Sequence, residues 1–138
     1  MSDDAPTRFA PPTSPAGAPF WEASRERRLV LPWCDGCARP HWYPREVCPH
    51  CLAPDVSWRP SDGRGTIYAA SVMPKPAMPM MASLVPYVVV LVDLDDGVRL
   101  MSNVIGCEPR AASVGRRVRA AWEPLEDGRH LLVFELDD

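Results

Sequence analysis

Residues 34–51 read CDGCARPHWYPREVCPHC, a stretch that begins and ends with a C-x2-C pair. Ten residues separate the two pairs. Two tight turns of this kind can bring four sulfur atoms around one metal ion at about 2.3 Å, in the tetrahedral geometry that zinc takes. The sequence therefore predicts one metal site with four thiolate ligands: Cys34, Cys37, Cys48 and Cys51.

We expect this metal to be structural zinc. Four thiolates leave no open coordination position for water or substrate. The stretch around the cysteines has little apolar content, so metal binding has to supply folding energy. Iron in a rubredoxin-like site uses the same ligands, and the spacing alone leaves iron open. His41 and His50 lie beside the ligands and are predicted at the surface or around the site.

Upstream of the cysteines, residues 1–19 are rich in Pro, Ala, Ser and Thr and have almost no large apolar side chain. Such a segment cannot offset the entropy of ordering, so it is predicted to be a disordered tail. The sequence FWEASRERRL then consists largely of good helix formers with helical spacing. We predict a helix over 20–32, ended by Pro32.

Downstream of the cysteines, five short runs are typical of strands. Asp95-Asp96-Gly97 separates the second and third runs, and Asp-Gly supplies the positive φ of a tight hairpin turn. Glu126-Asp127-Gly128 marks another turn. Five strands are the number in an OB-fold. The predicted strands are 66–72, 87–94, 98–104, 116–122 and 131–136.

The predicted fold is mainly β, with an N-terminal helix, a four-cysteine zinc ribbon and a five-stranded OB-fold barrel. The ribbon is predicted over 33–60 and the barrel over 61–138. A formal net charge of −3 argues against general affinity for phosphate backbones, so no nucleic-acid partner is expected. Without a long apolar run or a secretory signal, we expect no membrane association and a cytoplasmic protein.

Residues 73–86, MPKPAMPMMASLVP, contain four methionines and four prolines. Proline excludes a central strand, and methionine gives flexible apolar contacts. Two interpretations stay open: a surface loop lying on the barrel, or an adaptable docking surface for a partner or an apolar ligand.

No catalytic residues are predicted, because the sequence has no nucleophile motif, phosphate loop or framed pair of carboxylates. Cys107 has no basic neighbour in sequence and is expected as a small buried apolar residue. His130 is expected in solvent beside a turn. A group of arginines can be a solvated face or can hold the phosphates of a nucleotide-like ligand: Arg25, Arg27, Arg28, Arg39 and Arg45.

The sequence resembles the DUF35 family of zinc-ribbon and OB-fold proteins over essentially everything after Pro19. The family's motifs occur in the family's order: FWEASRERRLVLPWCDGC, PREVCPHC, GRGTIYAASV, VPYVVVLVDLDDGVRLMSNVIG and VGRRVRAAWEP. In this family, a glycine often follows the second cysteine of each C-x2-C turn, or knuckle. Here that position is Ala38 in the first knuckle and Leu52 in the second. This departure makes the expected left-handed turns less favourable.

The resemblance implies a non-catalytic accessory subunit that belongs to an acyl-CoA-processing complex. Members of this family associate with thiolase-superfamily enzymes, such as aldolases and acyltransferases, or with MaoC-like hydratases. They are proposed to help bind acyl-CoA, in pathways that include steroid and fatty-acid metabolism. A hetero-oligomer is expected, with a homodimer as the alternative for the isolated chain.

Within this hypothesis, Lys75 is the first candidate for a contact with a phosphate of acyl-CoA, flanked by Tyr68 and Tyr87. A second hypothesis is a nucleic-acid-binding module, since zinc ribbons and OB-folds both serve that role. A third is an enzyme that uses Cys107 or a histidine.

Overall fold

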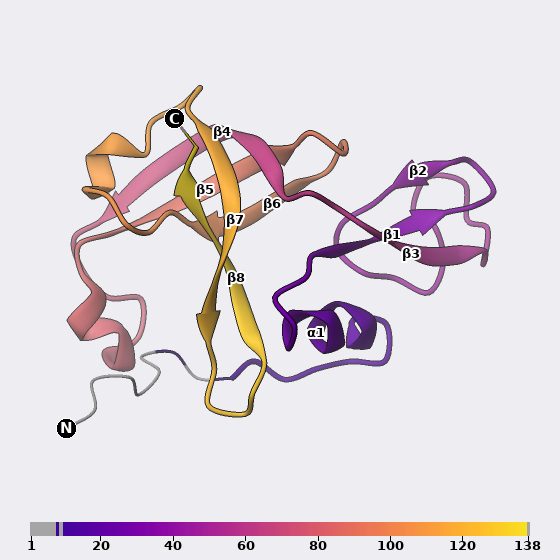
Figure 1. Cartoon of the computed structure of the whole chain (residues 1–138), viewed down its shortest axis with the longest axis horizontal. Coiled ribbons are helices and arrows are strands. Elements are labelled where there is room, and N and C mark those ends of the chain that lie inside the picture. The colour runs from indigo at the N-terminus through magenta and orange to yellow at the C-terminus, as the bar shows by residue number, and fades with distance from the viewer. Residues whose placement is uncertain (1–7, 9, 138) are drawn as a thin grey trace.

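The computed structural model describes residue 8 and residues 10–137. Much of the predicted tail, residues 1–7 and 9, lies outside the described residues. Figure 1 shows a small ribbon lobe beside a larger β-barrel, with one short helix between them. The mainly β fold predicted from the sequence is confirmed.

The N-terminal helix, α1 (Ala18–Ser24), is shorter than the range 20–32 predicted for it. It ends because Arg27 adopts a left-handed backbone with φ 56°. The N–H groups of Arg28 and Arg27 then donate to the carbonyls of Ala23 (3.1 Å) and Ser24 (3.0 Å), the usual hydrogen bonds of a left-handed helix end. Pro32, expected to end the helix, lies instead inside a strand.

The ribbon lobe is a three-stranded antiparallel sheet in the order β2-β1-β3. Its central strand contributes Leu31, which is fully buried and belongs to the main core of the molecule. The stretch is thus a strand paired with β3 that packs Leu31 into the core, and not a continuation of the helix. The strands are β1 (Val30–Cys34), β2 (Arg39–Pro40) and β3 (Val56–Pro60).

The barrel is a five-stranded antiparallel sheet in the order β6-β5-β4-β7-β8. A parallel bridge between Val104 and Phe134 brings its two ends together, so the barrel is nearly closed. All five predicted strands are confirmed, as is the hairpin at Gly97, which has φ 112°. The strands are β4 (Arg64–Met73), β5 (Tyr87–Leu94), β6 (Arg99–Asn103), β7 (Arg117–Pro124) and β8 (His130–Leu136).

Burial alternates along β5, which places Val88, Val90 and Val92 in the core, as the two-residue period of a strand requires. Two short 3-10 helices lie in the connections between strands. One is η1 (Pro79–Leu84), in the segment 73–86, which we call the methionine-rich loop; the other is η2 (Pro109–Ala111), before β7.

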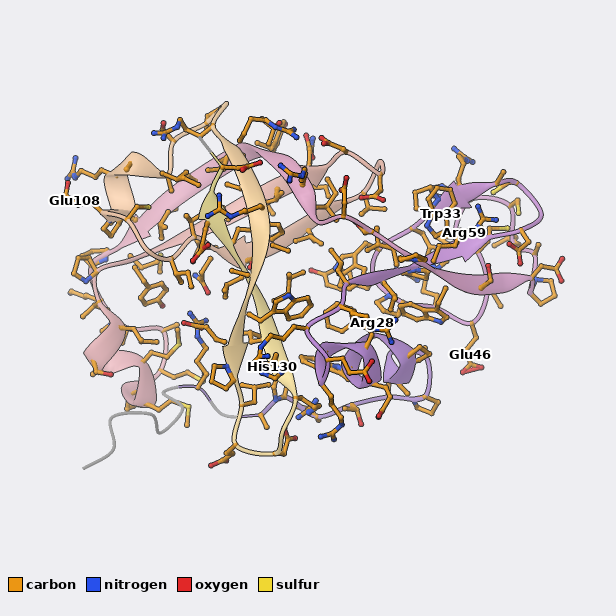
Figure 2. All side chains as sticks on the ribbon, in the orientation of Figure 1. Arg28, Trp33, Glu46, Arg59, Glu108 and His130 are labelled. Carbon is orange, nitrogen blue, oxygen red and sulfur yellow. The ribbon has the colours of Figure 1, made fainter. Side chains whose placement is uncertain are left out.

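Helix α1 packs against both β1 and β8, and buried polar contacts hold it there. The backbone N–H of His130 donates to the Ser24 hydroxyl (3.2 Å), and His130 Nδ1 lies 2.8 Å from the Ser24 carbonyl. His130 is therefore buried beside α1 and not solvated, contrary to the prediction (Figure 2). The guanidinium of Arg129 stacks 4.5 Å from the Trp21 ring. These contacts fix α1 to the β8 end of the barrel.

Candidate metal centre and its surroundings

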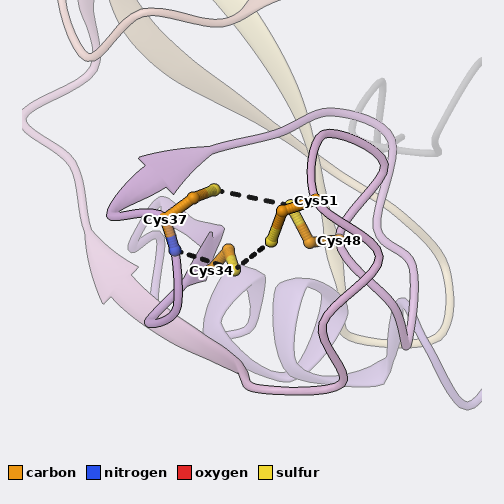
Figure 3. A group of neighbouring side chains, drawn as sticks. All are labelled: Cys34, Cys37, Cys48 and Cys51. Carbon is orange, nitrogen blue, oxygen red and sulfur yellow. Dashed lines mark hydrogen bonds between the residues drawn. The ribbon is translucent and has the colours of Figure 1, made fainter.

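The four predicted ligands lie together at the tip of the ribbon, where Figure 3 shows their sulfur atoms converging. The Sγ atoms of Cys34 and Cys51 are 3.6 Å apart, and those of Cys37 and Cys48 are 3.7 Å apart. Four thiolates at about 2.3 Å from one ion in a tetrahedron are spaced by about 3.8 Å. The cluster therefore fits a zinc ion with four sulfur ligands.

Each knuckle makes its left-handed turn without a glycine. Ala38 has φ 59° and Leu52 has φ 66°. Their N–H groups donate to the carbonyls of Cys34 (2.8 Å) and Cys48 (2.9 Å), which closes both turns. Backbone N–H groups also point at the sulfur atoms, from Cys37 to Cys34 Sγ (3.4 Å) and from His50 to Cys48 Sγ (3.3 Å). Both C-x2-C turns thus have the left-handed residue and the backbone hydrogen bonds of a zinc knuckle.

The electrostatics of the cluster favour a cation. Burial raises the pKa of Cys48, but hydrogen bonds from the N–H groups of Cys51 and His50 and from neighbouring thiols outweigh burial and lower it to about 6. A hydrogen bond from Ala53 lowers the pKa of Cys51, but the neighbouring thiols raise it to about 11. Adjacent thiolates repel one another, and a divalent cation removes that repulsion.

The two histidines near the ligands lie outside the sulfur cluster. His41 is only 3% exposed, so it does not lie at the surface, and the other predicted position, around the metal site, stays open. Burial and the nearby His50 lower the pKa of His41 and favour its neutral form. His50 is exposed, with Nε2 3.3 Å from the Pro40 carbonyl.

The structure does not bring together all three residues predicted to contact acyl-CoA, which are Lys75, Tyr68 and Tyr87. The Tyr87 hydroxyl accepts a hydrogen bond from the Ala77 N–H (3.2 Å), so Tyr87 touches the loop that carries the exposed Lys75. Tyr68 lies at an irregularity in β4, where the Arg99 guanidinium stacks 3.4 Å from its ring. Tyr68 is therefore separated from the loop by the rest of β4.

The methionine-rich loop borders a small apolar cavity of about 170 Å³, lined by Arg8, Pro11, Met78, Met80, Met81 and Leu131. Arg8 was not recognised from the sequence because its partners are distant along the chain. It donates to Asn103 Oδ1 (2.7 Å) and pairs with Glu123 (3.0 Å). The segment predicted as a tail thus contributes one wall of the cavity.

Several arginines on the barrel are paired with carboxylates. Arg99 pairs with Asp93 at 2.6 Å and Arg117 with Asp95 at 2.7 Å. Arg119 pairs with Glu135 at 3.2 Å. These pairs neutralise the cations that a phosphate backbone would need, and so give the nucleic-acid hypothesis no support. Among the described residues, no helix is long and apolar enough to cross a membrane.

Two family models match consecutive parts of the chain. Residues 21–57 match the model described as "ChsH2, rubredoxin-like zinc ribbon domain". Residues 58–123 match "ChsH2, C-terminal OB-fold domain". The boundary between them falls within β3, close to the junction of the ribbon and the barrel.

Three curated relatives match most of the chain. A probable enoyl-CoA hydratase alpha subunit of Thermomonospora curvata is 36% identical over 116 residues, covering 83% of this chain and 36% of the relative. A DUF35 domain-containing scaffold protein of Methanocaldococcus jannaschii is 28% identical, covering 78% of each. The 3-oxo-4,17-pregnadiene-20-carboxyl-CoA hydratase alpha subunit of Mycobacterium tuberculosis is 29% identical, covering 89% and 42%. The chain thus spans well under half the length of the two hydratase subunits.

One solved structure, named "Ltp2-ChsH2(DUF35) aldolase", contains a chain of similar size and shape. It superimposes with a TM-score of 0.82 at 33% sequence identity. The match covers 92% of this chain and 98% of that chain.

Proposed function

The chain belongs to the DUF35 family of zinc-ribbon and OB-fold proteins, and we propose that it is a non-catalytic accessory subunit of an acyl-CoA-processing enzyme. The observation that carries this proposal is the likeness to the chain of the Ltp2-ChsH2(DUF35) aldolase, which extends over 98% of that chain. The scaffold and hydratase relatives support the same role.

The partner we propose is a thiolase-superfamily enzyme, such as an aldolase or acyltransferase, or a MaoC-like hydratase. Apolar side chains at the surface support such a contact, because large apolar groups in solvent favour association. Met80 is 50% exposed on η1, and Leu52 is 75% exposed on the second knuckle. The proposed acyl group is a steroid or fatty acyl chain, in line with the steroid-CoA hydratase relative.

The zinc ion has a structural part in this role. Its four ligands would hold the ribbon in shape, and no coordination position would be left for a reacting group. Acyl-CoA would be bound by the assembled complex, with Lys75 and Tyr87 contributing from the methionine-rich loop side. Tyr68 would contribute only if the ligand extends along β4.

A pull-down from native lysate tests the partner. We expect the tagged chain to recover a thiolase-like enzyme or a hydratase, identified by mass spectrometry, with one zinc per chain. Met80→Asp should reduce recovery by at least about tenfold, since a charge in an apolar contact has to be desolvated. Val114→Asp is the matched control, because Val114 is 66% exposed but lies in the turn before β7. Recovery of nucleic acid, or of no acyl-CoA enzyme, would remove the proposal.

The CoA contact is tested in the assembled complex. We expect Lys75→Ala to weaken CoA binding by about tenfold, the effect of losing one charge-assisted contact of about 1.4 kcal/mol. Unchanged affinity would remove Lys75 from the site while leaving the subunit role intact.

A further inference from the structure

Arg27 occupies a backbone position that favours glycine. It follows α1 with φ 56°, and the turn there is made by backbone hydrogen bonds that any residue can supply. Glycine adopts this angle without steric cost, whereas a side chain costs free energy. The turn itself therefore does not require an arginine at position 27.

The side chains of Arg27 and Arg28 line a cavity of about 340 Å³ where the ribbon meets the barrel. Figure 2 shows Arg28 close to α1 at this junction. Gly63, at the entry to β4, and the half-buried Trp122 of β7 also line it. Two cations and an aromatic ring thus line the same cavity.

Arg27 is the unneutralised charge of this cavity. Within residues 8 and 10–137 it has no ion pair or side-chain hydrogen bond. Arg28 pairs with Glu26 at 2.9 Å, but both side chains are well exposed, and such pairs are weak enough to exchange for a better partner. Asp62 is the acidic group on the wall, and its Oδ1 accepts the Arg64 N–H (3.3 Å).

A guanidinium binds phosphate oxygens in a bidentate manner, and an indole face stacks on a heteroaromatic ring. The volume lies in the range of small-molecule sites. We propose that this cavity binds the adenosine diphosphate moiety that CoA shares with free nucleotides. Arg27 holds the phosphates and Trp122 packs against the base. Only the identification of CoA as the natural source rests on the proposed function.

Calorimetric titration of the full-length, zinc-loaded chain with ADP, CoA and adenosine tests this site. We expect saturable binding of ADP and CoA, and binding of adenosine at least about tenfold weaker because the phosphates are absent. Affinity for CoA above that for ADP identifies CoA as the source, and equal affinity identifies nucleotides in general. Absence of saturable ADP and CoA binding, or adenosine binding as tightly as ADP, overturns the proposal.

Arg27→Gly is the decisive variant, because it removes the cation and also suits the backbone. We expect ADP and CoA affinity to fall at least about tenfold while the melting temperature stays equal or rises. Arg39→Gln is the matched control, since Arg39 is also exposed but lies on β2, away from the cavity, and its affinity should be unchanged. Unchanged affinity in Arg27→Gly, or an equal loss in Arg39→Gln, rules out the site. Both titrations are independent of partner capture, so this site and the accessory role can fail separately.

Discussion

Among residues 8 and 10–137, three non-glycine residues hold left-handed backbone angles: Arg27, Ala38 and Leu52. At the knuckles, two local effects explain how the turn forms without glycine. The N–H groups of Ala38 and Leu52 each donate to the carbonyl of a ligand cysteine. The four sulfur ligands, gathered around one site, also hold the two turns in place. The free energy of metal binding exceeds the cost of an unfavourable angle, on the order of 1–2 kcal/mol.

Leu52→Gly should raise the free energy of unfolding of the zinc-loaded protein, by up to about 1 kcal/mol. Glycine relieves the left-handed angle, while its greater freedom in the unfolded chain offsets part of the gain. The measurement is the denaturant midpoint. Leu52→Ala is the control, because it removes the same exposed side chain but keeps the angle's cost. Equal midpoints for the two variants would show that no strain is held at this turn.

The β5–β6 hairpin carries carboxylates that are tied to arginines. A hydrogen bond from Arg99 lowers the pKa of Asp93, and one from Arg117 on β7 lowers the pKa of Asp95. A carboxyl whose folded pKa lies below its unfolded value, about 3.9, stabilises the fold above that pH. Its contribution is lost as the pH falls through the folded pKa.

The double variant Asp93→Asn, Asp95→Asn should therefore show a flatter loss of stability below about pH 4 than the unchanged protein. The measurement is the free energy of unfolding from neutral pH to below pH 3. Asp55→Asn serves as the control, since no side-chain pairing with an arginine is described for Asp55. If the free energy of unfolding of the double variant fell as steeply below pH 4 as that of the unchanged protein, a stabilising role for the two pairs would be contradicted.

Elements set by local pattern were predictable, and those set by distant contacts were not. Alternation along β5 and the Asp-Gly turn give the strands and the hairpin, and cysteine spacing gives the ligand set. The end of α1 depends on an angle at Arg27 that no propensity favours. The burial of His130 depends on Ser24, which is 106 residues away. Arg8 likewise meets its partners only after the barrel has formed.

The molecule as a whole has one continuous core that links the ribbon to the barrel. Phe20, Leu29 and Leu31 belong to the same buried cluster as the inward-facing side chains of β5. The tip of the ribbon lies outside this cluster and is held by the sulfur ligands. The metal and the core therefore stabilise different parts of the chain.

Removal of zinc with a chelator should unfold the tip of the ribbon and leave the barrel folded, because the four-sulfur site supplies on the order of 10 kcal/mol of apparent binding free energy. Hydrogen exchange should show lost protection in β2 and the knuckles, with protection kept in β4 to β8. Cys107→Ser is the control and should keep its zinc, since Cys107 lies outside the cluster. A metal-free ribbon that remains protected would contradict this division.

The closure of the barrel decides how another polypeptide can be recognised. Val104, just after β6, forms a β-bridge with Phe134 of β8, and the Ser102 hydroxyl donates to the Leu132 carbonyl (2.8 Å). Part of the hydrogen-bonding capacity of these two edge strands is therefore already used within the barrel. The ribbon sheet is open, with β2 and β3 as its outer strands. Pairing with an incoming strand through main-chain atoms is thus available at the ribbon. Where β6 and β8 meet, an incoming protein has to be recognised through contacts with side chains.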